Sequence, residues 1–423
     1  MEMIIASIIF LLTYLLIFTE TIHKTLAALL GGFLLLFTGI LGFSDILQLI
    51  DFQALVIILG LMIIVEVLRK SGIFQFLGIK VVKISKGDPK FLFLALMVLT
   101  VTLSAFLTNL TAIFIMCALT FMLCRSLKLN PIPFIISEAI LANIAGITLL
   151  TGTPTNILVA SASGISYMDF VRIILPLSLL LIGVTILISL IFYRKEFKKI
   201  SLEVGKLDEW SVVPDRKLFR NSLIIFFSMI IFFLVYDKIG LRLDFVVFAF
   251  TLISLLWSGA DVDEILGKVD WGALFFFIGL FVVVGGLEKT GVLELIADKF
   301  VEWVNGNVIL SIPLILWTST FVSGIVDNIP ATLTFIPIVD ILTNSFRMDV
   351  LWWCLIVGVA IGGNLTLISS PVNIIALSIA RKEGYKISFK EYLKIALPIL
   401  MLHLVLSTLY FSFGYIIPLH GKL

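Results

Sequence analysis

Apolar segments long enough to cross a lipid bilayer recur along the whole chain. About 20 apolar residues span the hydrocarbon core of a membrane. Only 14% of the 423 residues are charged, whereas a soluble domain averages about 25% charged residues. Hydrophobic residues make up 60% of the chain, against about 45–50% in a soluble domain. We therefore expect an all-α, multi-pass protein of the cell membrane, with the lipid bilayer as a partner. The predicted spans are 3–18, 24–41, 53–68, 132–162 and 172–193 in the first half, and 220–236, 243–258, 272–288, 351–380 and 394–418 in the second.

The remaining composition argues against several other classes of protein. The three cysteines and three histidines are scattered, which argues against a disulfide framework, a metal cluster and a histidine-based hydrolase. No GxxxxGK[ST] loop occurs, so an ATP-driven pump is not expected. Aspartyl intramembrane hydrolases need two facing Asp residues, one in a YD and one in a GxGD setting, and the sequence contains no GxGD. We predict neither an enzyme nor a nucleic-acid partner.

The chain contains an internal repeat. IDFQALVIILGLMIIVEVLRKSGIF begins at Ile50, and VDWGALFFFIGLFVVVGGLEKTGVL begins at Val269, an offset of 219 residues. The same offset aligns Asn109 with Asn328, while an offset of 217 aligns the loops TGTPTN and ISSPVN. Order and spacing hold throughout, so we interpret the chain as two copies of one unit, 1–193 and 220–423, joined by a linker at 194–219.

A longer apolar segment follows the third span of each copy, at 91–124 and 308–343, with polar residues in its middle. We interpret each as a re-entrant hairpin, which leaves the membrane on the side it entered. Each copy then has five crossings, an odd number, so the two repeats are predicted to be inverted. With both termini outside the cytoplasm, most of the 30 Lys and Arg residues fall in cytoplasmic loops, including the linker. Trp352 and Trp353 are expected in an interfacial belt.

Polar residues interrupt the apolar helices at four places, two in each copy. The hairpins turn at TNLT (Thr108–Thr111) and DNIPAT (Asp327–Thr332), and the fourth spans break at TGTPTN (Thr151–Asn156) and SSPVN (Ser369–Asn373). Broken backbone survives in lipid only where protein or a wet cavity satisfies its polar groups. Any single break can be a proline kink stabilised by local packing. Four breaks matched across the repeat instead favour one shared polar pocket and a broken helix in each repeat, at 132–162 and 351–380.

Two carboxyl groups lie inside apolar segments. Asp327 is the only charged residue between Val308 and Asp340. An ionised carboxylate at membrane depth is costly and usually marks an ion or proton path. We expect Asp327 to bind the coupling cation or proton, with capping of a half-helix as the alternative. For Glu138, both a place along an access path and a structural role remain open.

The matched breaks predict a binding site near the middle of the membrane. Inverted-repeat transporters bind substrate and coupling ions between such half-helix ends. Helix starts favour anions, whereas freed carbonyls and carboxylates favour cations. We therefore expect a secondary active transporter, or permease, that moves a small ion. We favour an anion or oxyacid as that ion, with Na⁺ or H⁺ as coupling ion and no other cofactor. The predicted binding residues are Thr108, Asn109, Thr111, Thr153, Pro154, Asn156, Asp327, Asn328, Thr332, Ser369, Ser370 and Asn373, and the candidate Na⁺ ligands among them are Asn109, Asn156, Asp327, Asn328 and Asn373.

At these four motifs the chain resembles the ion transporter superfamily. That superfamily includes arsenite permeases, NhaD-type Na⁺/H⁺ antiporters, CitM-type citrate transporters, divalent anion/Na⁺ symporters and the melanosomal P protein. The loops TPTN and SPVN match the small-residue–Pro–x–Asn pattern of the divalent anion symporters. The tip Asp327-Asn328-Ile329-Pro330 is closer to the arsenite permease, antiporter and P-protein branch, but Thr108 stands where NhaD-type antiporters tend to carry a second Asp.

The resemblance implies a homodimer with a scaffold part and a mobile transport part that moves like an elevator around the two hairpins. It leaves Na⁺/H⁺ antiport as the nearest alternative to anion transport. Arsenite efflux and a passive channel are further alternatives.

Overall fold

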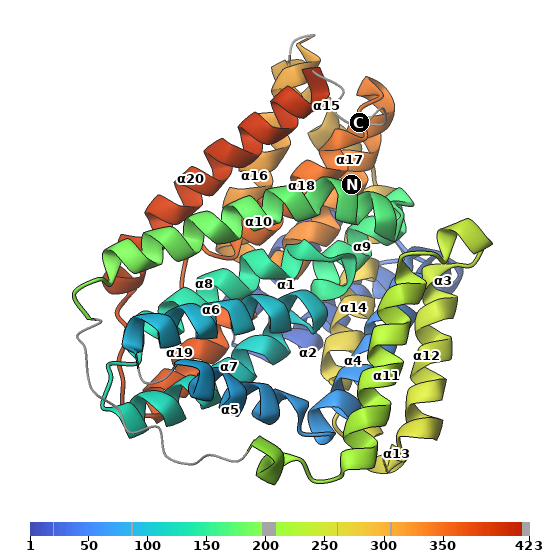
Figure 1. The fold of residues 1–423 in the computed structure, drawn as a ribbon. Helices are drawn as coiled ribbons and strands as arrows, with labels where there is room; N and C mark the ends of the chain where they lie inside the picture. Colours follow the sequence, from blue (N-terminus) through green and yellow to red (C-terminus); the bar gives the residue numbers. More distant parts are fainter. Residues whose placement is uncertain (20, 86–87, 197–208, 260, 305–306, 417–423) are drawn as a thin grey trace.

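The computed structural model describes residues 1–19, 21–85, 88–196, 209–259, 261–304 and 307–416. Within these ranges the chain forms helices joined by turns and short connections, with no strand (Figure 1). The prediction of an all-α fold is therefore confirmed. Residues 197–208 of the predicted linker lie outside the described ranges.

The described residues include eight helices that are long and apolar enough to cross a membrane. They are α1 (Glu2–Thr19), α4 (Phe52–Lys70), α6 (Pro89–Phe106), α10 (Tyr167–Phe192), α14 (Trp271–Lys289), α16 (Ser311–Val326), α17 (Asn328–Phe346) and α20 (Phe389–Ile416). Shorter apolar helices are α2 (Lys24–Phe37), α7 (Asn109–Leu127), α8 (Ile132–Ala145), α12 (Leu243–Ser258) and α18 (Val350–Gly362). The other α-helices are α3 (Phe43–Leu49), α5 (Ile73–Ser85), α9 (Pro154–Ser163), α11 (Arg216–Phe233), α13 (Val262–Leu266), α15 (Val292–Val304) and α19 (Pro371–Lys382).

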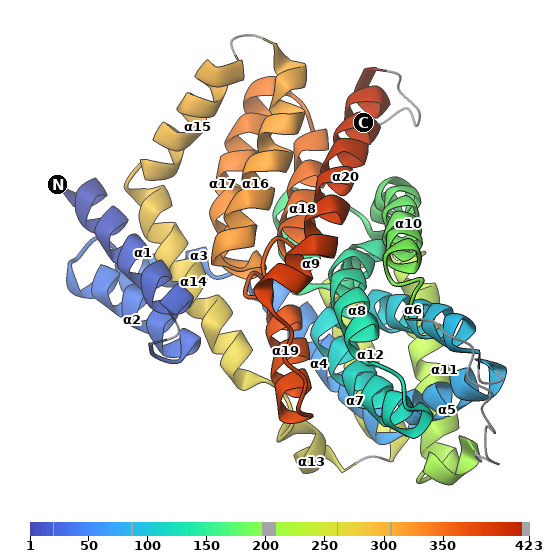
Figure 2. The same ribbon diagram turned by 90° about the vertical axis from the view of Figure 1, so that its left-hand side faces the viewer.

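The segments α4–α9 and α14–α19 contain the same order of elements. Each has a long helix, a shorter helix, two helices that pack against each other as a hairpin, and a pair of helices separated by an irregular loop. Figure 2 shows α15 to α18 at the top and α5 to α8 at the lower right, with α9 near the middle. Helix α18 contacts both α8 and α9, so the two segments meet at their interrupted helices.

The first helix of each segment begins with the same cap. The carboxylate of Asp51 accepts a hydrogen bond from the Ala54 amide at 2.9 Å, and that of Asp270 accepts one from the Ala273 amide at 2.9 Å. Such a cap satisfies a backbone donor that the helix itself leaves unpaired and contributes about 1 kcal/mol. The shared Asp in the sequence repeat therefore has one local structural cause.

Repeat-related glycines allow a neighbouring helix to approach each of these two helices. A Cβ at Gly60 of α4 would lie 2.6 Å from Val247 Cγ1 on α12. A Cβ at Gly279 of α14 would lie 2.7 Å from the backbone carbon of Ala28 on α2. Both distances are shorter than real contacts allow, so a larger residue would separate the helices.

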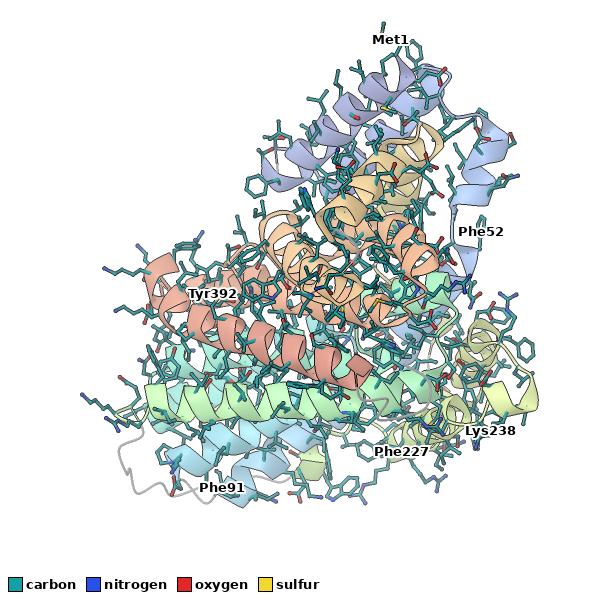
Figure 3. The ribbon with its side chains drawn as sticks, turned by 90° about the horizontal axis from the view of Figure 1, so that it is seen from above. Met1, Phe52, Phe91, Phe227, Lys238 and Tyr392 are labelled. Carbon is teal, nitrogen blue, oxygen red and sulfur yellow. The ribbon has the colours of Figure 1, made fainter. Side chains whose placement is uncertain are left out.

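The prediction for Trp352 and Trp353 is wrong. These side chains are 5% and 4% exposed, inside helix α18, every residue of which is buried. The Trp353 ring packs against Phe170 of α10, with ring centroids 5.8 Å apart. Helices α10 and α20 lie side by side next to this core (Figures 1 and 3). An aromatic pair at the end of an apolar segment is equally compatible with a packed interior, because hydropathy does not distinguish protein from lipid.

Candidate functional site

The first interrupted helix is closed by one asparagine. Helix α8 ends at Ala145, two short 3₁₀ turns follow, and α9 starts at Pro154. The Asn156 amide nitrogen donates to the carbonyl oxygens of Gly146 and Leu149, both at 3.0 Å. Thr153 caps α9 by accepting a hydrogen bond from the Asn156 backbone amide at 3.3 Å. Proline fits the first turn of α9 because its missing N–H would have no helical partner there.

The second interrupted helix is closed in the same way. The Asn373 amide nitrogen donates to the carbonyl oxygens of Gly363 at 2.8 Å and Thr366 at 2.9 Å. Ser370 caps α19 through the Val372 amide, and the Ser369 hydroxyl also donates to the Gly363 carbonyl, at 2.9 Å. The two small-residue–Pro–x–Asn motifs therefore build equivalent loops.

The tip of the first hairpin, between α6 and α7, packs on the first of these loops. Thr108 caps α7, accepting from the Thr111 amide at 3.4 Å, and its hydroxyl lies 3.0 Å from the Thr111 hydroxyl. Asn109 is buried, and its Cβ lies 3.5 Å from the position that a Cβ on Gly146 would occupy. The first tip and first loop are thus in direct contact.

The tip of the second hairpin packs on the second loop. Asn328 is buried, and its Oδ1 accepts a hydrogen bond from the Ser323 hydroxyl at 2.9 Å. A Cβ on Gly363 would lie 2.8 Å from Asn328 Nδ2. Thr332 donates to the Asn328 carbonyl at 2.7 Å, one turn further along α17.

Asn143 of α8 joins the two halves of the site. Its amide nitrogen donates to Asn364 Oδ1 at 2.8 Å, to the Gly363 carbonyl at 3.2 Å and to Asn373 Oδ1 at 3.4 Å. Its Oδ1 accepts from the Ser370 hydroxyl at 2.9 Å, and Asn109 Nδ2 approaches it at 3.5 Å. One buried amide therefore contacts the first tip and the second loop.

Two further residues complete this network. Asn364 donates to the Ile140 carbonyl at 3.1 Å, which ties the second loop to α8. The Tyr392 hydroxyl accepts from Asn373 Nδ2 at 3.1 Å and donates to the Asn364 carbonyl at 3.2 Å. Figure 3 labels Tyr392 near the start of α20.

Sequence reasoning missed Asn143, Asn364 and Tyr392. The first of these lies within an apolar helix rather than at a break, so no proline or cap drew attention to it. The signal that would have found it is an uncharged amide in an otherwise apolar span, which is costly in lipid unless it has partners. Of the predicted residues, the network brings together Asn109, Ser370 and Asn373.

Asp327 is the one residue between α16 and α17, and its backbone has φ 115° and ψ 149°. A side chain other than glycine rarely adopts this conformation, and the strain amounts to about 1–3 kcal/mol. The Asp327 side chain makes no capping hydrogen bond to α17 and is half-buried. Asp327 therefore does not cap α17 with its side chain, which was the alternative to ion binding.

Buried oxygen atoms in the first loop remain available for a ligand. Asn156 Oδ1 and Thr148 Oγ1 have no hydrogen-bond partner among the described residues. Buried polar atoms are almost always satisfied, so such exceptions indicate a missing partner. Amide and hydroxyl oxygens are suitable ligands for a hard cation and acceptors for a protonated substrate.

A polar cavity of about 360 Å³ lies beside the first loop. Leu150 of the loop, Ser161 and Ser166 line it together with Gln53 and Arg242. The Arg242 guanidinium donates to Asp244 at 2.9 Å and to Gln53 at 3.0 Å. This cavity connects the loop with exposed polar residues.

Curated relatives resemble the chain over nearly its whole length. A 46 kDa membrane protein of Mycobacterium leprae is 31% identical over 98% of this chain and 99% of its own. An uncharacterized transporter of Mycobacterium tuberculosis is 32% identical over 98% of this chain and 99% of its own length. The human P protein is 25% identical over 98% of this chain, which spans 60% of that longer protein.

A solved structure has the same fold. The YdaH transporter of Alcanivorax borkumensis superposes with a TM-score of 0.61, at 13% identity, over 98% of this chain and 99% of its own. Together with the apolar helices, these likenesses define a multi-pass membrane transporter and not an enzyme. A family model described as citrate transporter matches residues 14–358. The chain belongs to this CitMHS family.

Proposed function

We propose that the protein is a secondary active transporter of a small anion or oxyacid, driven by a gradient of Na⁺ or H⁺. The observation that carries the proposal is the buried amide network around Asn143, in which the first hairpin tip meets the second loop. Amide groups present both donors and acceptors, and the starts of α9 and α19 add backbone N–H groups that favour an anion. The family description, citrate transporter, agrees with an organic anion as substrate.

The predicted residues take distinct roles in this proposal. Asn109, Asn156, Asn328 and Asn373 contact the substrate or Na⁺ through their amides. The hydroxyls of Thr108, Thr111, Thr153, Thr332, Ser369 and Ser370 supply further ligands, and Pro154 starts the half-helix. Asp327 carries the coupling cation or proton, which its half-buried place at the second tip supports.

The proposed membrane arrangement follows the sequence repeat. The two copies have inverted topology, the hairpins α6–α7 and α16–α17 are re-entrant, and both termini are extracytoplasmic. The equal element order of α4–α9 and α14–α19 supports the two copies on which this arrangement is based. We further propose a homodimer in which the hairpin-bearing part moves against a scaffold.

The proposal is tested by transport in proteoliposomes with imposed sodium or pH gradients. The substrates offered are citrate, succinate, phosphate and arsenite. Wild-type protein is expected to accumulate at least one of them against its concentration gradient. Asp327→Asn is expected to abolish that gradient-driven accumulation, while Asp340→Asn, an exposed carboxylate on the same helix α17, retains it. Full gradient-driven transport by Asp327→Asn would refute the coupling role.

The same experiment separates the alternatives. Sodium flux driven by a pH gradient, with none of the four anions moved, would identify an NhaD-type antiporter. Outward movement of arsenite alone would identify an arsenite efflux permease. Flux that only equalises concentrations would identify a passive channel.

A further inference from the structure

A carboxyl group that the proposed binding site does not use lies inside the protein. Glu138 is in the middle of α8 and is 0% exposed. Helices α6, α7, α10, α18 and α19 pack against α8 and its continuation. The internal repeat has offsets of 217 and 219 residues, and these place Leu355 and Val357 at the position of Glu138 in the second copy. The second copy therefore has no counterpart to this carboxyl group.

The hydrogen bonding of Glu138 is incomplete. The Thr120 hydroxyl of α7, itself fully buried, donates to Glu138 Oε1 at 2.6 Å. Glu138 Oε2 is buried and has no hydrogen-bond partner within the described residues. A carboxylate normally accepts several hydrogen bonds, so one neutral donor does not replace its hydration.

No positive charge offsets a carboxylate at this position in the described part of the chain. Glu138 is in none of the ion pairs. The titratable groups that interact with it are the thiols of Cys117 and Cys124 on α7. The other titratable side chains of these helices are the buried Tyr167 on α10 and Cys354 on α18, and the exposed Lys90, Arg125, Asp169, Arg172, Arg381 and Lys382. Helix α20 also packs against Ile136 and Ile140 of α8, and its titratable side chains are the buried Tyr392 and His403, the half-buried Glu391 and Tyr410, and the exposed Lys390 and Lys394.

An unpaired charge in such surroundings is strongly disfavoured, and a bound proton removes it. Glu138 also lies on the same helix as Asn143, five residues earlier, which corresponds to a rise of about 7.5 Å. A change in the position of α8 or the hairpin during transport would therefore alter the access of water to both groups.

We infer that Glu138 is a proton-binding site of the transport cycle, separate from the second hairpin tip. Its carboxyl group holds a proton while it is buried as in this structure. The proton passes to water when the site opens on one side, and water on the other side returns a proton to the carboxylate. This inference rests on the proposed transport function and identifies H⁺ as a coupling ion.

The carboxyl group can be detected without knowledge of the substrate. In infrared spectra of the purified protein, wild type is expected to show the carbonyl stretch of a protonated carboxylic acid, and Glu138→Gln is expected to lack it. Thr120→Val keeps the acid but removes its hydrogen-bond donor, so the band is expected to shift. Identical bands in wild type and Glu138→Gln would overturn the inference.

The transport test uses citrate uptake into proteoliposomes with the membrane potential clamped. One proton per substrate and a gradient of one pH unit sustain about tenfold accumulation. Glu138→Gln is expected to lose this factor while retaining citrate exchange at equal pH, which requires no net proton movement. Glu302→Gln, an exposed carboxylate on α15, is expected to keep both activities.

The outcomes distinguish this inference from the proposed function. Two results would overturn the proton site and leave the transport function intact. In the first, Glu138→Gln accumulates substrate as fully as wild type does. In the second, a sodium gradient alone drives accumulation by wild type. Absence of uphill transport of any substrate by wild type would instead overturn the proposed function. The infrared spectra would then decide by themselves whether Glu138 holds a proton.

Discussion

Replacement of Asn143 by leucine tests whether the two halves of the site depend on one another. Leucine is similar in size but makes no hydrogen bonds, so Asn143→Leu removes the link between α8 and the second loop. Its two short hydrogen bonds are those with Asn364 Oδ1 at 2.8 Å and the Ser370 hydroxyl at 2.9 Å. Each buried polar group left without its partner costs about 1–3 kcal/mol, so the expected loss of stability is about 2–6 kcal/mol.

Asn221→Leu is the matched control. Asn221 is also buried, but its amide donates one hydrogen bond, to the Trp257 carbonyl at 3.1 Å, and it lies on α11. One lost bond predicts a cost of about 1–3 kcal/mol, roughly half that of Asn143→Leu. Transport is expected to survive in the control because Asn221 belongs to neither a hairpin nor a loop.

The assay is thermal unfolding of both variants in one detergent, followed by citrate uptake in proteoliposomes. Asn143→Leu is expected to unfold at a lower temperature than Asn221→Leu and to lose transport even at temperatures where it remains folded. An Asn143→Leu protein that matches the wild type in both measurements would show that the network does not hold the site together.

Two other substitutions test single contacts of the site. Gly363→Ala is expected to reduce citrate uptake at least tenfold, because its Cβ would lie 2.8 Å from Asn328 Nδ2, whereas Gly183→Ala on α10, with open space around it, should transport normally. Equal uptake rates in these two variants would contradict the tight packing at the second tip. Tyr392→Phe removes the hydroxyl that contacts Asn373 and Asn364 and is expected to cost about 1 kcal/mol and weaken substrate affinity. Unchanged unfolding temperature and uptake KM would show that this hydroxyl has no part in supporting the loop.

The interrupted helices could be predicted because their causes are local. Thr153-Pro154 and Ser370-Pro371 combine a cap with a proline at the first helical position, and the structure starts α9 and α19 at these prolines. The hairpin turns at Thr108 and Asp327 were likewise marked by polar residues in apolar segments. Such signals need no knowledge of distant contacts.

The partners of these loops could not be predicted because they depend on long-range packing. Asn143 meets Asn364 across 221 residues of sequence, and no local pattern specifies that distance. Trp352 and Trp353 illustrate the same limit, since an apolar helix in lipid and one inside the protein have the same hydropathy. Only the packing of α18 between other helices decides where these rings lie.

The two loops have the same fold but differ in the oxygen atoms that they leave available. In the second loop, Asn373 Oδ1 already accepts from Asn143 at 3.4 Å, and Ser369 and Ser370 donate to neighbouring oxygens. In the first loop, Asn156 Oδ1 and Thr148 Oγ1 are buried without such partners among the described residues. Because a cation needs free oxygen ligands, any sodium ion bound in addition to the ion at Asp327 is expected at the first loop. The two loops differ in free oxygen atoms because of Asn143. This residue lies on the first interrupted helix but forms its short hydrogen bonds with the second loop.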